Sequence, residues 1–251
     1  MSLHRIAILK IGGSVLTDAA SFGRAAEFVA HRLAEEPGTK LVVVVSAEHG
    51  VTDALLEMAR GVCRSPDPQM VDLLWSTGEL RSVALLALAL QARGVRATGI
   101  NVHQTGLTEP QGAGAPGHAH FRPLRLLAEL AGHAVVVVPG FLARAAGDAV
   151  KSLGRGGSDL TAVLLAAGLG AGRCELVKDV SGYFSKDPNR HPDAPHVPVL
   201  SYAAALAMAD DGCELVQRAA ITAAQEHAVP VVVRSIAGKR QTHITNQDFH
   251  G

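Results

Sequence analysis

Residues 152–162 form a glycine-rich turn whose residue types are suited to binding an anion. Three glycines surround Arg155, and Ser158 and Asp159 stand at the start of a helical pattern that continues into an apolar run, residues 163–171. A helix that begins beside such a turn offers unpaired backbone N–H groups and the positive end of its dipole. A capped helix after an ordinary glycine turn is the alternative. Two charges beside glycines, which let a ligand approach the backbone, favour the anion site.

A second candidate for anion binding lies at the end of the first predicted strand, residues 6–11. Lys10 there precedes the run Gly-Gly-Ser at residues 12–14, so its ammonium group would lie near backbone N–H groups that can approach a ligand. A solvated lysine that ends a strand is the equally simple alternative for Lys10 alone. Together with Arg155, it supplies two cations on two glycine-rich turns, an arrangement that suits a phosphoryl group in transfer.

Several motifs of nucleotide-binding proteins and hydrolases are absent from the sequence. It holds no Gly-x-x-x-x-Gly-Lys-Ser/Thr phosphate loop, no Gly-x-Gly-x-x-Gly at the first strand-to-helix junction and no Gly-x-Ser-x-Gly nucleophile turn. A Rossmann dinucleotide site and an α/β-hydrolase are therefore disfavoured. The loop histidines lack the spacing of tetrahedral metal ligands, so no metal site is predicted. These histidines are His103, His118, His120, His191 and His196.

Charge and composition point to a protein that acts on small molecules. The 251 residues hold 23 Lys and Arg against 23 Asp and Glu, so no net field favours nucleic acid or an acidic membrane surface. The apolar run at residues 6–9 is interrupted by Lys10 and does not suit a signal peptide, and the run at residues 82–90 is too short to span a bilayer. The three isolated cysteines suit reduced thiols, so a cytoplasmic location is expected.

Apolar strands alternate with helical patterns along the whole chain. Strands are predicted at residues 6–11, 41–45, 95–100, 134–138, 174–177 and 229–233. Helices are predicted at residues 22–33, 52–62, 70–92 with an interruption near Gly78, 124–130, 158–171, 202–208 and 214–226. This order predicts an α/β fold with a largely parallel sheet and helices on both faces.

The polar residues of the predicted strands gather at one edge of the sheet. Ligands of parallel sheets bind beyond the carboxyl ends of the strands. Those ends hold Lys10 with its glycines, residues 46–47, residues 140–141 and residues 178–179. The candidate chemistry is therefore expected on one side of the molecule.

Three segments are expected to be irregular. Residues 106–120 are rich in glycine and predict a mobile surface loop, and residues 182–195 predict a long loop with three prolines. The tail from residue 237 predicts either an edge hairpin or a disordered end.

Six motifs follow one another along residues 6–233. The sharpest is Leu-Gly-Arg-Gly-Gly-Ser-Asp-x-Thr-Ala at residues 153–162. The others are Lys-Ile-Gly-Gly-Ser at 10–14, Val-Ser-Ala with Gly-Val-Thr-Asp at 45–53, Thr-Gly-Glu-Leu at 77–80, Gly-Phe at 140–141, and Lys-Asp-Val-Ser-Gly with Asp-Pro at 178–188. In this order they make the chain resemble the catalytic domain of aspartokinase in the amino-acid kinase family.

The resemblance implies a single catalytic domain over residues 1–251, built as a three-layer αβα sandwich with a mainly parallel central sheet. Its N-terminal half would bind the amino-acid substrate and its C-terminal half MgATP, with Mg²⁺ held mainly by the nucleotide phosphates. The implied reaction transfers the γ-phosphoryl group of ATP to the side-chain carboxylate of aspartate or a close analogue. A homodimer is expected, without the ACT regulatory modules that follow the catalytic domain in typical aspartokinases.

The same resemblance implies a role for each matching residue. Lys10 and Asp159 would be catalytic, with Lys10 at the transferring phosphoryl group and Asp159 orienting the reacting groups. Glu79 would pair with the α-ammonium group of the substrate, and Arg155 would hold its α-carboxylate in a bidentate fork. The residues expected to bind the amino-acid substrate are Ser46, Ala47, Thr52, Glu79, Arg155 and Ser158. The residues expected to bind the nucleotide are Gly12, Gly13, Ser14, Lys178, Asp179, Tyr183 and Asp187.

Two departures from the family pattern keep other functions open. Glu214 stands where the family has a lysine that reaches the nucleotide phosphates, and Glu48 and His49 replace small residues near the substrate pocket. One alternative is a family member that has lost catalysis and serves as a binding or scaffold subunit. The other is a kinase of the same family with a different acidic acceptor, for which Glu79 would matter little.

Overall fold

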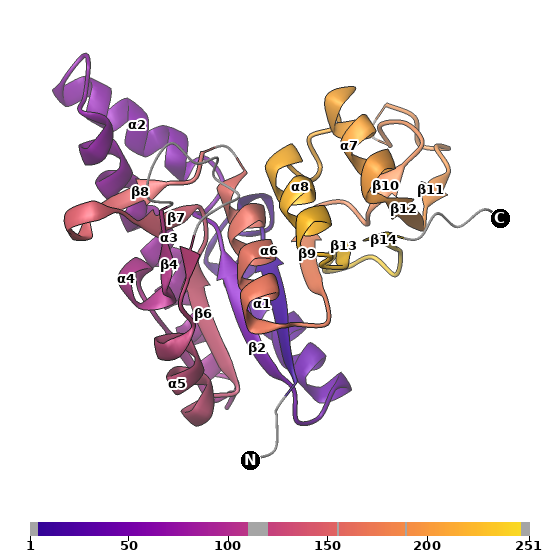
Figure 1. Ribbon diagram of the computed structural model, residues 1–251, viewed down its shortest axis with the longest axis horizontal. Coiled ribbons are helices and arrows are strands. Elements are labelled where there is room, and N and C mark those ends of the chain that lie inside the picture. The colour runs from indigo at the N-terminus through magenta and orange to yellow at the C-terminus, as the bar shows by residue number, and fades with distance from the viewer. Residues whose placement is uncertain (1–4, 110–119, 155, 189, 247–251) are drawn as a thin grey trace.

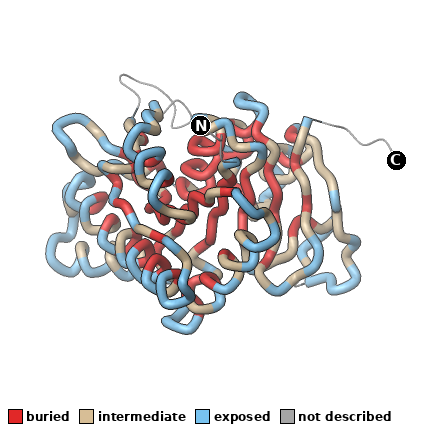
Figure 2. Tube along the Cα trace, turned by 90° about the horizontal axis from the view of Figure 1, so that it is seen from below, coloured by how far each residue is buried: buried red, intermediate tan, exposed pale blue. Residues whose placement is uncertain are grey.

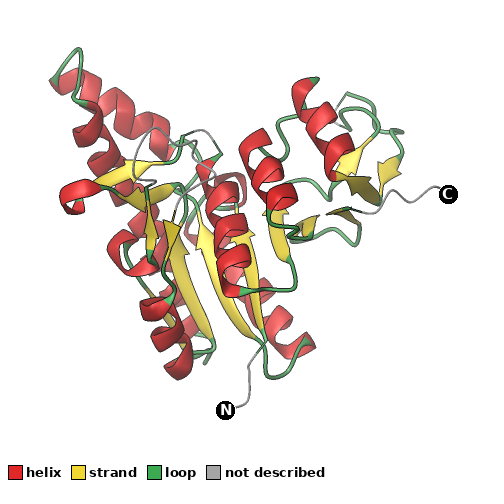
Figure 3. Ribbon diagram, viewed as in Figure 1, coloured by secondary structure: helices red, strands yellow, loops and turns green. Residues whose placement is uncertain are grey.

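The centre of the molecule is an eight-stranded sheet with helices on both faces (Figures 1 and 3). The computed structural model describes residues 5–109, 120–154, 156–188 and 190–246. From one edge to the other the strands are β12 (Val199–Ser201), β14 (Gln241–Thr245), β13 (Val231–Ser235), β9 (Cys174–Lys178), β1 (Ile6–Ile11), β2 (Lys40–Val45), β6 (Val135–Pro139) and β3 (Ala97–Gly99). All neighbouring pairs run parallel except β13 with β14. The predicted α/β fold with a mainly parallel central sheet is confirmed.

Helices connect most of the strands. They are α1 (Ala19–Glu35), α2 (Val51–Val62), α3 (Pro68–Gln91), α4 (Val102–Thr105), α5 (Leu124–Gly132), α6 (Gly157–Leu169), α7 (Tyr202–Asp210) and α8 (Arg218–Glu226). Two of them, α1 and α8, begin three or more residues away from the predicted start. The side chain of Asp18 accepts a hydrogen bond from the backbone N–H of Ser21 at 2.7 Å and so caps α1 earlier than residue 22. Residues 212–217 are not helical, so α8 begins at Arg218 rather than at residue 214.

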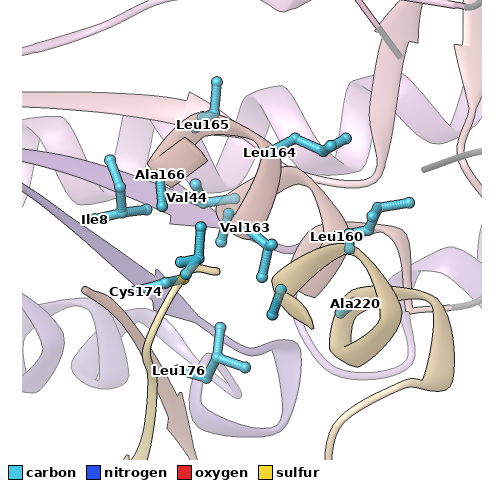
Figure 4. Packing of buried hydrophobic residues seen from close by; sticks show 14 of the residues in the cluster. Ile8, Val44, Leu160, Val163, Leu164, Leu165, Ala166, Cys174, Leu176 and Ala220 are labelled. Carbon is cyan, nitrogen blue, oxygen red and sulfur yellow. The ribbon is translucent and has the colours of Figure 1, made fainter. Parts of the chain in front are cut away.

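Two hydrophobic cores, one on each face of the sheet, account for the three layers. Alternate residues of β2 point to opposite faces, so Val42 and Val44 belong to one core and Val43 and Val45 to the other. The first core contains buried residues of α5, α6 and α8, and the second contains buried residues of α1 and α3. Figure 4 shows side chains of α6 packed against Val44 and other strand residues of the first core. Buried residues accordingly gather in the interior, with exposed residues around them (Figure 2).

Helix α3 is continuous through Gly78, so the predicted interruption near this residue was wrong. A Cβ atom at Gly78 would lie 3.0 Å from Val51 Cγ1 and 3.3 Å from both Ala47 Cβ and Leu55 Cδ1. The glycine therefore allows α2 and the end of β2 to approach α3 closely, and it does not break the helix. Tertiary packing here outweighs the low helix propensity of glycine.

The structure contains short strands that the sequence patterns missed. β4 (Leu107–Thr108), β5 (His120–Phe121), β7 (Leu142–Arg144) and β8 (Val150–Ser152) form a second sheet, and β10 (Tyr183–Phe184) pairs with β11 (His196–Val197). Strands of two or three residues are too short for alternation to show in a sequence. The predicted loops at 106–120 and 182–195 were therefore wrong at these strands, and residues 110–119 lie outside the described residues.

Within the tail beyond residue 237, β14 forms part of the central sheet. β14 pairs antiparallel with β13 and parallel with β12 on its other side. The predicted hairpin is therefore present, but β14 is an inner strand rather than an edge strand. The predicted strand at residues 95–100 is shorter than expected, because β3 contains only Ala97–Gly99.

Helix α3 has the length and apolar composition of a membrane span, with 24 residues and a mean hydropathy of 1.4 in its most apolar window. This is longer than the apolar run predicted at residues 82–90. Of that window, 44% is buried, and the helix packs against α1, α2 and β6. A core helix of a globular domain has the same properties.

Gly168 provides a test of the packing of α6 against Phe121, a residue of β5 in the second sheet. A Cβ atom there would lie 2.1 Å from Cδ1 of Phe121, so we expect Gly168→Ala to lower the free energy of unfolding by about 1–3 kcal/mol through overpacking. Gly23→Ala in α1 is the matched control, because its nearest contact is Arg93 Nη2 at 3.9 Å. This control should raise the free energy of unfolding by about 0.5–1 kcal/mol. Urea unfolding measures both, and equal effects would contradict the packing of Phe121 on α6.

Candidate active site

A cavity of about 310 Å³, named the first cavity, lies at the carboxyl ends of β1, β2 and β9. Its walls come from five different parts of the fold, namely the strand ends, α2, α3, the start of α6 and the turn before α8. The lining residues are Lys10, Ser46, Thr52, Glu79, Phe141, Gly156, Gly157, Ser158, Asp159, Lys178 and Gln217. Seven of the residues predicted for the site thus meet in one place, which are Lys10, Ser46, Thr52, Glu79, Ser158, Asp159 and Lys178.

Two lysines hold one carboxylate in the first cavity. Asp159 Oδ1 lies 2.9 Å from Lys10 Nζ, and its Oδ2 lies 2.7 Å from Lys178 Nζ. The side chain of Asp159 is only 2% exposed. Burial would raise the pKa of the Asp159 carboxyl, but the two ammonium groups outweigh it and hold that pKa below its usual range. The three side chains together carry one excess positive charge, which favours an anion beside them.

The secondary structure positions this trio of charges. Lys178 is the last residue of β9 and Lys10 is the second-to-last residue of β1, the parallel neighbour of β9, which brings both side chains to the same sheet edge. Asp159 stands in the first turn of α6, whose positive dipole end also favours its carboxylate. Burial and the charge of Lys10 lower the pKa of Lys178, and Asp159 opposes both.

Glycine at the ends of β1 and β6 allows the strand ends to pack closely. A Cβ atom at Gly13 would lie 2.6 Å from the carbonyl oxygen of Ala47, and one at Gly140 would lie 2.6 Å from Cβ of Ser158. The next residue after Gly13, Ser14, donates a hydrogen bond from Oγ to Asp179 Oδ1 at 3.3 Å. Residues 12–14, Ala47 and Asp179 therefore lie beside the first cavity without lining it.

Glu79 is a buried carboxyl group that forms no ion pair with any of the described residues. It is 3% exposed, and among the described residues its Oε2 has no hydrogen-bond partner. Burial raises its pKa to about 8, although a hydrogen bond from the backbone N–H of Ala47 and the charge of Lys10 act in the opposite direction. A cationic group that entered the cavity would favour the ionised form of Glu79 and could donate a hydrogen bond to its Oε2, which lacks one among the described residues.

Phe141 lines the first cavity but was not among the predicted site residues. Its φ of 68° lies in the left-handed region that β-branched and bulky residues rarely adopt. The ring meets Trp75 edge to face with 5.5 Å between centroids, and Trp75 Nε1 donates to the carbonyl oxygen of Thr52 at 3.0 Å. Strained backbone of this kind clusters at binding sites, so Phe141 and the unpredicted Gln217 join the candidate residues. The sequence offered two signals for Phe141, its position at a strand end and its place in the Gly-Phe motif.

Arg155 lies outside the described residues, so its predicted contact with a substrate carboxylate stays a prediction. The flanking glycines are described. Gly154 and Gly156 have φ values of 81° and 74°, and a Cβ atom at Gly156 would lie 1.9 Å from Cγ of Gln217. Glycine is thus required at Gly156 both for the turn and for the approach of α8.

A second cavity, of about 560 Å³, adjoins the turns after β9 and before α8. Its lining residues are Val180, Gly182, Tyr183, Phe184, Ser185, Lys186, Asp187, Pro188, Met208, Asp211, Gly212, Cys213, Glu214 and Leu215. Tyr183 and Asp187 were predicted to bind a nucleotide and lie here, away from the first cavity. The ring of Tyr183 is 1% exposed and belongs to the hydrophobic core, and burial raises the pKa of its phenol.

Glu214 shares the second cavity with a cationic side chain. Lys186 lines the same cavity as Glu214. Two arginines close to this segment or to Asp187 in the sequence form ion pairs of their own, Arg218 with Asp210 at 3.0 Å and Arg190 with Asp187 at 3.8 Å. Over the described part of the chain, no cluster of three or more His, Cys, Asp or Glu side chains could hold a metal ion.

Comparison with known proteins finds aspartokinases. The chain is 36% identical over 230 residues to an aspartokinase of Thermus thermophilus, a match that covers 92% of this chain and 56% of that protein. The crystal structure of aspartate kinase from Synechocystis matches with a TM-score of 0.84 and 31% identity, covering 98% of this chain and 40% of that chain. E. coli aspartokinase III, solved with aspartate and ADP, has the same fold, with a TM-score of 0.82, 24% identity, and coverage of 98% and 66%.

The similarity extends over almost the whole chain but not over the whole of its relatives. The chain spans 56% of the length of the Thermus protein. The sequence profile of the amino acid kinase family matches residues 5–235, which include every strand and helix that lines the first cavity. The chain therefore belongs to the amino acid kinase family.

Proposed function

We propose that this chain transfers the γ-phosphoryl group of ATP to the side-chain carboxylate of aspartate. The observation that carries the proposal is the pair of lysines on Asp159 in the same cavity as the buried carboxyl group of Glu79. The two lysines suit phosphoryl oxygens, and Glu79 suits an ammonium group, so the cavity as a whole suits an amino acid as the phosphoryl acceptor. Relatives of this chain named aspartokinase support the choice of aspartate.

The charges of the first cavity suit the reaction. An oxygen of the substrate carboxylate attacks the γ-phosphorus, the bond to the β,γ-bridging oxygen breaks, and ADP leaves. Lys10 and Lys178 would face the phosphoryl oxygens, and Asp159 would hold both ammonium groups in place. Because positioning and charge provide most of the catalysis of phosphoryl transfer, this fixed arrangement is the essential part of the site.

The substrate would be held by groups around the lysines. In our proposal Glu79 accepts from the α-ammonium group, and Ser46, Thr52 and Ser158 provide hydroxyl groups at the cavity wall. Ala47 would act through its backbone, which donates to Glu79. The predicted role of Arg155 as a fork for the α-carboxylate completes the set.

The second cavity would take the nucleotide, so the N-terminal half of the domain would bind the acceptor and the C-terminal half ATP. Residues 12–14 and Asp179 lie between the strand ends and would approach the phosphates. Mg²⁺ would be held mainly by the phosphates, whose charge it neutralises when bound. Lys186 provides a cation in the cavity that also contains Glu214.

A homodimer and a cytoplasmic location are further parts of the proposal. Apolar side chains of α3 that are more than half exposed, Met70, Leu73 and Leu88, support a surface for a second copy. The cysteines Cys63, Cys174 and Cys213 are all free, as expected in a reducing compartment.

The activity can be tested directly with purified protein, MgATP and L-aspartate in the presence of hydroxylamine. An acyl phosphate should be trapped as the hydroxamate in an amount equal to the ADP released. ADP release with another carboxylate but not with aspartate would support the alternative acceptor. No turnover of any acid, together with no tight Mg²⁺-dependent nucleotide binding, would instead favour the non-catalytic binding or scaffold subunit that Glu214 suggests as an alternative.

The raised pKa of Glu79 predicts how aspartate binding depends on pH. Below about pH 8 the free carboxyl group is protonated, so binding an ammonium group requires loss of a proton. The KM for aspartate should therefore fall by about tenfold per pH unit from pH 6 to 7.5 and then level off. Glu79→Gln should remove this slope and raise the KM at pH 8 by about 30-fold or more. A wild-type KM that is independent of pH would contradict the assignment.

Unfolding free energies provide an independent check on the same group. Because the folded pKa of Glu79 is raised, the folded state keeps a proton that the unfolded state loses near pH 4.5. The stability of the wild type should therefore fall as the pH rises from 5 to 8, by about 1.4 kcal/mol per pH unit relative to Glu79→Gln.

Lys10 should affect the rate more than substrate binding. Lys10→Met removes one of the two cations on Asp159, and we expect kcat to fall by about 10²–10³-fold while the KM for aspartate changes little. Lys151→Met is the control, because this lysine is outside the first cavity and pairs with Asp72 at 3.8 Å. Steady-state ADP release measures both. A Lys10→Met enzyme with normal kcat and a raised KM would show that Lys10 binds the acceptor instead.

A further inference from the structure

Gln217 lines the first cavity, two residues after a run of residues that line the second. In the segment before α8, residues 212–215 line the second cavity, Val216 is buried, and Gln217 lines the first. The chain after β9 makes the same transition, since Lys178 lines the first cavity and residues from Val180 onward line the second. A group that moves from a nucleotide to an acceptor crosses this boundary, so Gln217 and Lys178 stand beside its route.

The side chain of Gln217 is not used by its own helix. Gln217 is the N-cap residue of α8, and its backbone carbonyl accepts from the N–H of Ala220 at 2.9 Å, but its side chain makes no capping hydrogen bond. The aliphatic part packs on Gly156, where a Cβ atom would lie 1.9 Å from Gln217 Cγ. Within the described residues its carboxamide has no hydrogen-bond partner. Gly156 therefore holds the aliphatic part of the side chain, and none of the described residues engages its polar end.

We infer that the carboxamide of Gln217 donates a hydrogen bond to an oxygen of the transferring phosphoryl group. Lys10 and Lys178 already supply the positive charge at this place, and a neutral N–H donor adds direction without further charge repulsion. The inference rests on the proposed kinase function and extends it by a phosphoryl contact from α8. The segment before α8 would then connect the two cavities, with residues 212–215 at the nucleotide and Gln217 at the transferring phosphoryl group.

The first experiment separates hydrogen bonding from packing. Gln217→Met keeps a side chain of similar length on Gly156 but removes the N–H donors, so we expect kcat to fall by about 10²-fold with the KM for aspartate within about threefold of the wild type. Gln225→Met is the matched control, because Gln225 is an exposed residue of the same helix. Thermal unfolding verifies that both variants are folded. A Gln217→Met enzyme with the wild-type kcat would overturn the inference and leave Gln217 as a packing residue.

The second experiment needs no acceptor and uses calorimetry with MgATP and MgADP. Gln217→Glu has the same shape as the wild type but places a carboxylate beside the phosphoryl group. The affinity for MgATP should therefore fall about tenfold more than the affinity for MgADP. Equal weakening of both nucleotides would overturn the inference, because the side chain would then not face the γ-phosphoryl group. This result is informative even if Gln217→Met fails to fold.

The two experiments also separate this inference from the proposed function. A wild type that turns over no aspartate, combined with selective loss of MgATP affinity in Gln217→Glu, would reject the acceptor and support Gln217 as a phosphoryl contact. Wild-type turnover of aspartate, combined with an unchanged kcat in Gln217→Met, would support the proposed function and reject Gln217 as a phosphoryl contact. A wild type that binds neither nucleotide would overturn both.

Discussion

The carboxylate of Asp159 between two ammonium groups is the interaction on which the rest of the site depends. Lys10 and Lys178 lie near each other because β1 and β9 are parallel neighbours, and both ammonium groups contact the same carboxylate. Without that carboxylate, two buried cations so placed would repel each other strongly. Asp159 makes the arrangement stable by entering from α6. Gly140, directly after β6, contributes to this arrangement, because a Cβ atom there would lie 2.6 Å from Cβ of Ser158 and would push the first turn of α6 away from the strand ends.

Some of the site could be predicted from the sequence because its residues lie at strand ends or in a dense motif. Lys10 follows a run of apolar residues, and Asp159 follows three glycines, so the local sequence alone marks both positions. Gly78 shows the opposite case, because it suggests a helix break when only the chain is considered and a close helix contact when its neighbours are known. The left-handed backbone of Phe141 and the contact of Gln217 with the distant Gly156 are set by tertiary structure, so the sequence did not show that these side chains line the cavity.

The same contrast applies to the fold. Long apolar strands and the alternation of strands with helices were sufficient to predict the layers, because burial on both faces leaves a continuous apolar run. Short strands such as β7 and β8 gave no such signal, and neither did the inner position of β14. These elements are held by pairing with strands far away in the chain. Their local sequence therefore says little about them.

The place of β14 has a consequence for how the domain is assembled. The family profile ends at residue 235, yet residues 241–245 form the strand that joins β12 to β13. During synthesis, β12 and α7 emerge from the ribosome before the strand that connects them to the sheet. The half that adjoins the second cavity would therefore be completed last, and a chain cut at the end of the family match would leave β12 without its neighbour. The end of the family profile and the end of the central sheet are thus different in this protein.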